Sequence, residues 1–145
     1  MSKYAAFGAK LVYDPASSNL DVAQITNISG PGISTDAIDV TAHDSAAGTR
    51  EFLPGLVDAG EVTVELFFDA EASAGTGADS GLNVLEKKAQ DRSTNTWQIV
   101  NATSTDMYRR FSGIVTAFSF SSPVDGAITA SATIKLTGII STGTA

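Results

Sequence analysis

The stretch from Asp36 to Asp69, DAIDVTAHDSAAGTREFLPGLVDAGEVTVELFFD, decides how the fold is interpreted. Its last part alternates strictly, with Val62, Val64, Leu66 and Phe68 on one side, which is the pattern of a half-buried antiparallel strand. Its middle part is a long, polar, glycine-containing connection without an apolar period. A connection of this kind must find its order outside the subunit's own core, and it therefore favours a contact arm used in assembly.

Outward from this stretch, most of the chain has the pattern of β-strands. We expect strands over 4–13, 21–28, 36–41, 61–68, 96–101, 111–121 and 127–140. In the last two we expect two apolar faces, consisting of Ile114, Phe118 and Phe120, and of Ile128, Ala130, Ala132, Ile134 and Leu136. The turn Pro123 to Gly126 joins these two strands as a hairpin.

One helix is expected over about residues 80–90, because Leu82, Leu85 and Ala89 fall on one helical stripe. The predicted fold class is mainly β: a β-sandwich or partly closed barrel of antiparallel strands, with one flanking α-helix and a long inter-strand loop over about residues 42–60. The length of 145 residues fits one domain over 1–145.

The composition excludes several classes of function. The net charge of −7 argues against binding along DNA or RNA, whose affinity comes chiefly from Lys and Arg at phosphates. The absence of cysteine excludes disulfides, a thiol nucleophile and thiolate metal sites. No signal peptide and no membrane span are expected. Only 17% of residues are charged, which leaves much surface to small polar residues that suit burial between subunits.

Candidate catalytic residues are few. His43, Asp44 and Ser45 are the residue types of a hydrolytic triad, but adjacent residues cannot readily form the relay, so we interpret them as contact surface. No catalytic residue, metal site or cofactor is predicted. Two alternatives stay open: a small β-sandwich glycoside hydrolase using Glu61 or Glu65, and a carbohydrate-binding β-sandwich module. Both are weakened, because the two glutamates lie on the solvated side of their strand and Trp97 is the only tryptophan.

A series of short motifs occurs in a fixed order along the chain. They are Asp36–Thr41, Ser45, Arg50–Phe52, Gly55–Leu66, a lone helix, Trp97, Phe111–Val115, Pro123–Gly126 and Thr137-Gly138. In this order and spacing the chain resembles the major tail tube proteins of long-tailed, siphovirus-like bacteriophages over roughly residues 4 to 140. The same fold recurs in the inner tubes of contractile tails and of type VI secretion.

The resemblance implies a structural protein, not an enzyme, that forms hexameric rings stacked into a tube for DNA ejection. Asp36–Thr41 and Glu61–Phe68 would be strands of the ring, and Ala42–Gly60 would be the arm between rings. Arg50 and Phe52 would anchor that contact, because a charged guanidinium and a buried aromatic ring are frequent interface hot spots. The full set of expected inter-ring contacts is Arg50, Glu51, Phe52, Leu53 and Asp58.

The resemblance also implies partners and a location. The partners are other copies of the chain, a tape measure protein in the lumen, tail initiator and terminator proteins, and DNA that passes without specific binding, with no membrane involved. The location is the virion tail, assembled in the host cytoplasm. An acidic, polar wall would repel phosphates, and the expected lumen-facing residues are Glu61, Glu65, Thr129, Ser131 and Thr133.

Overall fold

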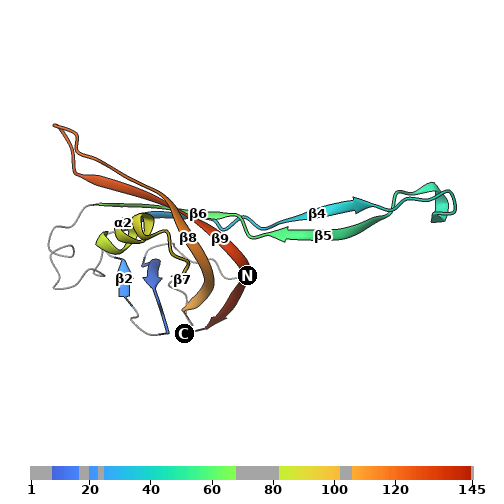
Figure 1. Ribbon diagram of the computed structural model, residues 1–145, viewed down its shortest axis with the longest axis horizontal. Helices are drawn as coiled ribbons and strands as arrows, with labels where there is room; N and C mark the ends of the chain where they lie inside the picture. Colours follow the sequence, from blue (N-terminus) through green and yellow to red (C-terminus); the bar gives the residue numbers. More distant parts are fainter. Residues whose placement is uncertain (1–7, 17–19, 23–24, 68–81, 102–105, 145) are drawn as a thin grey trace.

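The computed structural model describes residues 8–16, 20–22, 25–67, 82–101 and 106–144. Seven strands form one antiparallel sheet in the order β2-β1-β7-β8-β9-β6-β3, which curls into a half-barrel (Figure 1). The strands of this sheet are β1 Lys10–Tyr13, β2 Leu20–Val22, β3 Ile25–Ser29, β6 Glu61–Phe67, β7 Asn95–Val100, β8 Met107–Ser121 and β9 Thr129–Thr144. This confirms the predicted partly closed barrel, because the sheet is curled but its two edges do not meet.

The core fills the concave side of the curled sheet, where the helix α2, Leu82–Asp91, packs against β8. Val84 and Leu85 of α2 are fully buried in it. At its centre Trp97 is fully buried and meets the ring of Tyr13 edge to face, with centroids 5.2 Å apart. The predicted helix is thus confirmed, as one that closes the core of the half-barrel.

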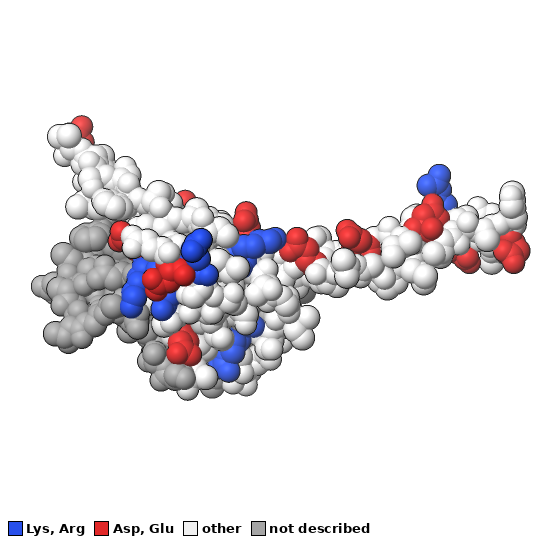
Figure 2. Space-filling model, viewed as in Figure 1, with Lys and Arg blue, Asp and Glu red and all other residues white. Residues whose placement is uncertain are grey.

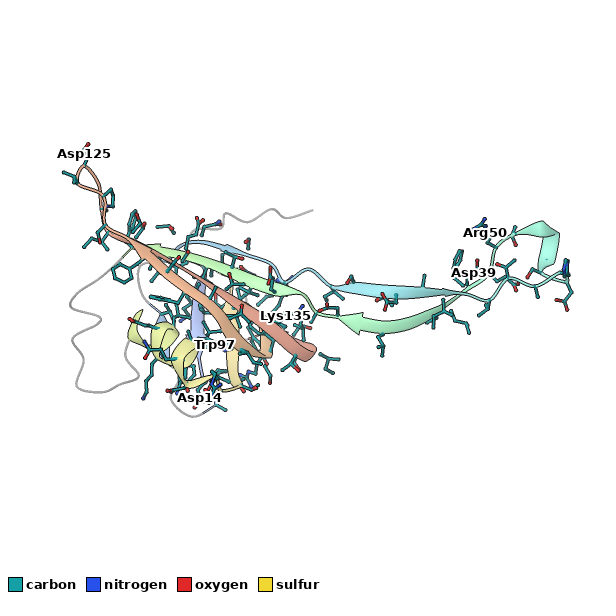
Figure 3. All side chains as sticks on the ribbon, turned by 45° about the horizontal axis from the view of Figure 1, so that its top comes forward. Asp14, Asp39, Arg50, Trp97, Asp125 and Lys135 are labelled. Carbon is teal, nitrogen blue, oxygen red and sulfur yellow. The ribbon has the colours of Figure 1, made fainter. Side chains whose placement is uncertain are left out.

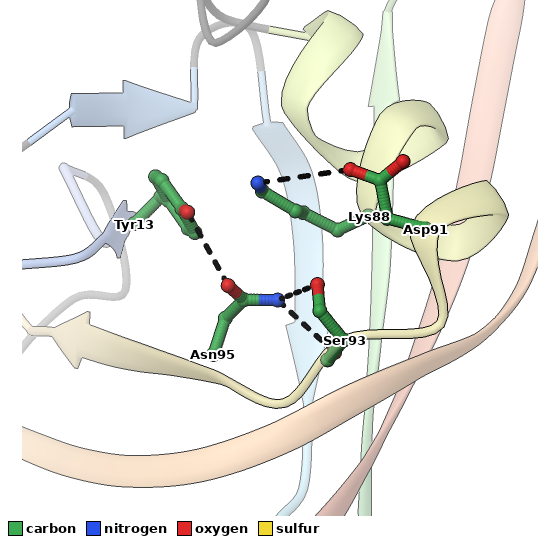
Figure 4. A network of polar contacts seen from close by, with 5 residues as sticks. All are labelled: Tyr13, Lys88, Asp91, Ser93 and Asn95. Carbon is green, nitrogen blue, oxygen red and sulfur yellow. Dashed lines mark hydrogen bonds and ion pairs between the residues drawn. The ribbon is translucent and has the colours of Figure 1, made fainter.

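A small polar network stabilises the rim of this core near the end of α2 (Figure 4). The Tyr13 hydroxyl donates to Asn95 Oδ1 at 3.3 Å, and Asn95 Nδ2 donates to the carbonyl and hydroxyl oxygens of Ser93. Lys88 pairs with Asp91 at 3.9 Å and holds its ammonium 5.5 Å from the centre of the Tyr13 ring. These contacts join the helix end to β1 and to the start of β7.

The alternation in the two decisive strands is confirmed. In β6, Val62, Val64 and Leu66 are buried, whereas Phe68 lies outside the described residues. In β9, Ala130, Ala132, Ile134 and Leu136 are buried, as expected, but Ile128 was wrongly placed with them, because it precedes the strand and is 40% exposed. The β8–β9 hairpin is also confirmed. Residues 4–7 of the first expected strand lie outside the described residues, and the strand over 96–101 is found as β7.

Two strand predictions were wrong in detail. The single strand expected over 21–28 is replaced by β2 and β3, which lie on opposite edges of the sheet. In β8, Ile114 and Phe118 do not share a face. A register shift between Val115 and Ala117 changes which alternate residues face the core, so Val115 is buried before it and Phe118 packs on the core after it. Ile114 is 37% exposed, on the other face.

The largest correction concerns the expected loop over 42–60. Its second half is a strand, β5 Phe52–Asp58, which pairs with β4 Ser34–Asp39 in a separate two-stranded sheet. This hairpin projects from the body (Figure 1), so Asp36–Thr41 contributes no strand to the main sheet. Pro54 and Gly55 concealed β5, because both residues are depleted in strands. A two-stranded ribbon accepts proline because each strand has an unpaired edge, and a register shift near Thr35 accommodates the irregularity.

Candidate assembly interface

We call the hairpin of residues 34–58 the arm, and its junction with the sheet the root. At the root, Asp58 Oδ1 accepts a hydrogen bond from the Gly60 N–H at 2.8 Å. Lys135 of β9 donates to the same oxygen at 3.0 Å. The pKa of Asp58 lies below its usual value. The hydrogen bond from the Gly60 N–H is the largest cause, and the hydrogen bond and positive charge of Lys135 lower the pKa further. The arm is thereby tied to the sheet on which the core is built.

Two glycines allow the chain to pass closely at the root. Gly60 has a φ of +77°, and a Cβ added there would collide with the carbonyl oxygen of Gly32. Gly30 has a φ of +93°, and a Cβ there would collide with the carbonyl oxygen of Glu61. Both positions need glycine for backbone conformation and for space. Because the Leu136 N–H also donates to the Gly60 oxygen at 3.1 Å, the root is held by backbone contacts as well as by the ion pair.

The tip of the arm is ordered by polar contacts instead of by an apolar core. The Glu51 N–H donates to the Thr41 hydroxyl at 2.8 Å, and the Val40 N–H donates to the Glu51 carbonyl at 2.9 Å. The Ser45 hydroxyl donates to the Glu51 carboxylate at 2.9 Å and accepts from the Ala42 N–H. This network encloses the short 3-10 helix η1, Ala46–Gly48. The hydroxyl of Ser45, one of the three residues with the types of a hydrolytic triad, therefore donates to Glu51.

Asp39 stabilises the start of the tip. Its carboxylate accepts the Thr41 N–H at 2.9 Å. Hydrogen bonding from the Thr41 side chain, and then from its backbone, lowers the pKa of Asp39. The carboxylate therefore remains ionised to a lower pH than an ordinary aspartate, and the arm keeps this negative charge near its tip.

Along its length the arm exposes large apolar side chains. Their exposed fractions are 53% for Ile38, 53% for Phe52, 55% for Leu53, 83% for Leu56 and 59% for Val57. An isolated two-stranded hairpin is marginally stable in water, and soluble chains rarely expose a contiguous apolar surface of this kind. The exposed apolar side chains of the arm are therefore typical of a protein interface.

The structure places the expected inter-ring residues in different surroundings. Arg50, Phe52 and Leu53 are exposed on the arm, with Arg50 beside the tip (Figure 3). Glu51 is part of the tip network, and Asp58 is bonded to Lys135 at the root. Sequence reasoning missed the apolar residues Ile38, Leu56 and Val57. The apolar letters of FLPGLV were the available signal, but their lack of alternation concealed their role.

The five residues expected at the lumen lie together on the outer face of β6 and β9. Glu65 pairs with Ser131, Thr63 with Thr133, Phe67 with Thr129, and Glu61 with Lys135, so all these side chains point away from the core. A depression on this face is lined in part by Thr26, Glu65, Ser119, Thr129 and Ser131. Ser119 and Thr26 were not expected there. The Ser119 and Ser131 hydroxyls lie 3.1 Å apart, and Thr26 donates to the Glu65 carbonyl.

Figure 2 shows acidic side chains spaced along the arm, whereas most of the basic side chains lie on the body. Within the described ranges, no three His, Asp or Glu side chains gather as metal ligands would. In the same part of the chain, no helix has the length and apolar character that crossing a membrane requires.

A β-rich body with an arm that exposes large apolar side chains is typical of a structural subunit that binds other chains. The sequence model of the family described as phage tail tube protein matches residues 27–142. The chain therefore belongs to the phage tail tube protein family, and it is a structural component of the tail tube of a virion or phage-like particle. This confirms the resemblance found in the sequence, and it favours the tube over the hydrolase and carbohydrate-binding alternatives. No curated protein matches the sequence.

Solved structures share the fold. A chain in the virion of a native gene transfer agent particle has a TM-score of 0.74 and 14% identity, with 97% of this chain and 99% of that chain covered. A chain in the tail of an empty gene transfer agent particle gives 0.67 and 15%, with 92% of both chains covered. The SPP1 tail tube gives 0.62 and 14%, with 94% and 77% covered. At these identities the likeness establishes a common fold.

Proposed function

We propose that the chain acts as one tail-tube-like domain over residues 1–145 and assembles into hexameric rings that stack into a hollow tube for DNA ejection. Membership of the tail tube family supports this proposal. So does the C6 symmetry stated for the gene transfer agent tail that shares the fold. Assembly takes place in the host cytoplasm and the product is part of the virion tail.

The observation that carries the proposal is the arm. It leaves the body from a root fixed by Gly60 and the Asp58–Lys135 pair, and it exposes apolar side chains that its own subunit does not cover. We infer that it contacts the neighbouring ring, with Arg50, Phe52 and Leu53 touching that ring directly. Full burial of an exposed side chain of this size contributes about 1.5–3 kcal/mol, and docking would supply about half of that for Phe52 and Leu53, which are 53% and 55% exposed. Glu51 and Asp58 keep the tip and the root in the shape that this contact requires.

We further propose that the outer face of β6 and β9 lines the lumen, with Glu61, Glu65, Thr129, Ser131 and Thr133 toward the bore. Two carboxylates among small hydroxyl side chains repel phosphates, and the ammonium of Lys135 on the same face is already paired with Asp58. DNA would pass such a wall without specific binding. A tape measure protein occupies the lumen during assembly, and initiator and terminator proteins bind the two ends. This role requires no catalysis, cofactor, metal ion or membrane.

The proposal is tested by shortening the arm. Residues 36–56 are replaced by Asn-Gly, a two-residue hairpin turn, between the paired residues Thr35 and Val57. The root, with Asp58, Gly60 and Lys135, is left intact. Electron microscopy of the concentrated unaltered protein, with tail initiator supplied, should show tubes. The shortened variant should form none, while fluorescence of the buried Trp97 reports that its body is folded.

Three results are distinguishable in this test. A folded body without tubes supports the arm as the stacking contact. Tubes formed by the shortened variant would show that stacking does not depend on the arm. An unaltered protein that stays monomeric even with the initiator would overturn the proposed function as a whole.

A further inference from the structure

The turn at the end of the β8–β9 hairpin takes no part in the sheet. The two strands pair as far as Ser121 and Thr129, and all of residues 122–128 between them are exposed. Asp125 lies at the tip of the hairpin, away from the body (Figure 3). Among the described residues, no hydrogen bond or ion pair restrains its carboxylate. The side chain of Asp125 is therefore free to change its orientation.

Asp125 is followed by Gly126, and this is the only Asp-Gly pair in the sequence. The carboxyl carbon of an aspartate and the backbone nitrogen of the next residue can close a five-membered ring, a succinimide. Glycine favours this closure, because it has no Cβ to hinder the nitrogen and its backbone is the most adaptable. Within the described residues, the Gly126 N–H makes no hydrogen bond of ordinary geometry. No strong contact thus holds this nitrogen away from the carboxyl group.

The tip of the arm provides a contrasting site, where the exposed Asp44 also precedes a small residue, Ser45. There the Ser45 N–H donates to the Ala42 carbonyl at 3.1 Å, and the Ser45 hydroxyl donates to the Glu51 carboxylate at 2.9 Å. Attack by the Ser45 nitrogen requires these contacts to open first. The fold therefore restrains the reacting nitrogen at Asp44 but not at Asp125.

We propose that Asp125 isomerises to isoaspartate in the folded subunit. The Gly126 nitrogen attacks the Cγ of the protonated carboxyl group, a C–N bond forms, and the carboxyl hydroxyl leaves with the amide proton as water. Water then adds to one of the two succinimide carbonyls, and breakage of the C–N bond at that carbonyl gives aspartate or isoaspartate. The reaction consumes no reagent other than water. It takes place in the free subunit, so it does not depend on the proposed assembly into tubes.

Isomerisation changes the shape of the hairpin tip at constant charge. In isoaspartate the main chain runs through Cβ and Cγ, so it is longer by one carbon, and the carboxylate is attached directly to Cα. Asp125 is the only charged residue between Arg110 and Lys135 in the sequence. The reaction therefore moves the one carboxylate of the hairpin relative to the fully exposed Val124 beside it.

The proposal is tested by comparing two sites in one protein. The folded subunit is incubated in mildly acidic buffer, which protonates more of the carboxyl groups, and a second sample is incubated unfolded in urea. Isoaspartate is located by enzymatic methylation of its carboxylate and peptide mapping. In the folded subunit Asp125 should accumulate at least about tenfold more isoaspartate than Asp44, because reaction at Asp44 requires local opening. Unfolding should accelerate the reaction at Asp44 and change the rate at Asp125 by only about twofold or less.

Gly126→Ala is the control for the attacking nitrogen. An added Cβ would lie 3.2 Å from the Pro123 Cγ, which a small shift of the proline ring can relieve, and the φ of Gly126 lies outside the left-handed region. The turn should therefore persist, while isoaspartate at Asp125 falls by about tenfold, because a Cβ hinders the nitrogen.

Three results would overturn the inference. If Asp125 stays intact in the folded subunit but isomerises in urea, the turn protects it. If Asp125 and Asp44 react equally in the folded subunit, the contacts at the tip of the arm do not set the difference. If Gly126→Ala isomerises as fast as the unaltered protein, the glycine is not the cause of the reactivity.

Discussion

Replacing Gly60 by alanine should destabilise the subunit and change the direction in which the arm leaves the body. Gly60 has a φ of +77°, and its missing Cβ is where the Gly32 carbonyl oxygen approaches. Gly138 of β9 is a matched control, because its φ is +78° and nothing lies within 4 Å of an added Cβ. Both substitutions place an alanine in the left-handed region, but only Gly60→Ala adds a collision with backbone.

The two variants should differ in their free energy of unfolding. Left-handed backbone at a residue with a Cβ costs about 1–2 kcal/mol, and a smaller unfolded-state entropy offsets about 0.4–1 kcal/mol of that. Gly138→Ala should therefore lose about 1 kcal/mol or less. Relieving an overpacked contact costs a further 1–3 kcal/mol or so, which gives roughly 2–4 kcal/mol for Gly60→Ala.

Urea unfolding followed by Trp97 fluorescence measures this difference, with the slope m expected to be unchanged. Relief of the collision also moves Gly32 away from Gly60, so the arm should leave the body at another angle and tube yield should fall even where the subunit is folded. Gly138→Ala is the reference for both readouts. Equal losses of stability in the two variants would refute the argument that close approach, not backbone conformation alone, requires glycine at the root.

Three further predictions follow from the core, the root and the outer face. Ile134→Ala should cost about 2–5 kcal/mol in urea unfolding, because Ile134 is fully buried, whereas Ile139→Ala in the same strand should cost little at 84% exposure. Asp58→Asn should weaken the pH dependence of stability in acid. The folded pKa of Asp58 lies below its ordinary value, so its contribution is full above about pH 4 and is lost as pH falls through the folded pKa. If the free energy of unfolding falls with pH in acid as steeply in Asp58→Asn as in the unaltered protein, this prediction is wrong. Glu65→Lys tubes should retain DNA in a low-salt pull-down that unaltered tubes do not, and equal retention would argue against Glu65 facing the bore.

The sequence predicted those strands whose two faces have different surroundings. β6 and β9 each have one face in the core and one outside it, so strict alternation located them and their buried residues. The arm strands have no core on either side, and β5 accordingly shows an apolar run interrupted by Pro54 and Gly55. Alternation measures a difference in burial between two faces, so it gave no signal for β5, whereas β4 was expected as the strand over 36–41 although both of its faces are exposed.

A different physical cause explains the missed boundaries. The register shift after Val115 depends on how β8 and β9 fit together, and no local pattern encodes it. The division of 21–28 into β2 and β3 likewise depends on pairing partners, β1 and β6, that are distant in sequence. Non-local contacts of this kind override local propensity in sheets.

The expected inter-ring residues lie on the arm, and their contact with another ring stays a prediction. Arg50, Phe52 and Leu53 were expected there from the resemblance to tail tube proteins, and they are exposed. The internal partners of Glu51 and Asp58 could not be predicted, because Ser45 and Lys135 reach them only once the tip and the root have folded. The expected outer face was found intact, since β-strand periodicity alone places Glu61 and Glu65 on one side.

In the free subunit the arm must not associate with other arms, whereas in the tube it must bind its partners. The charged side chains of the arm oppose the unwanted association. Exposed apolar strands with unpaired edges invite non-specific pairing between chains. The carboxylates of Asp36 and Asp39 lie among the apolar side chains of the arm, and like charges oppose the stacking of two identical arms. Because Thr41 lowers the pKa of Asp39, this charge persists into moderate acid. Correct docking must therefore place these carboxylates where water or a complementary group remains, which selects one arrangement of copies among the many that apolar contact alone would permit.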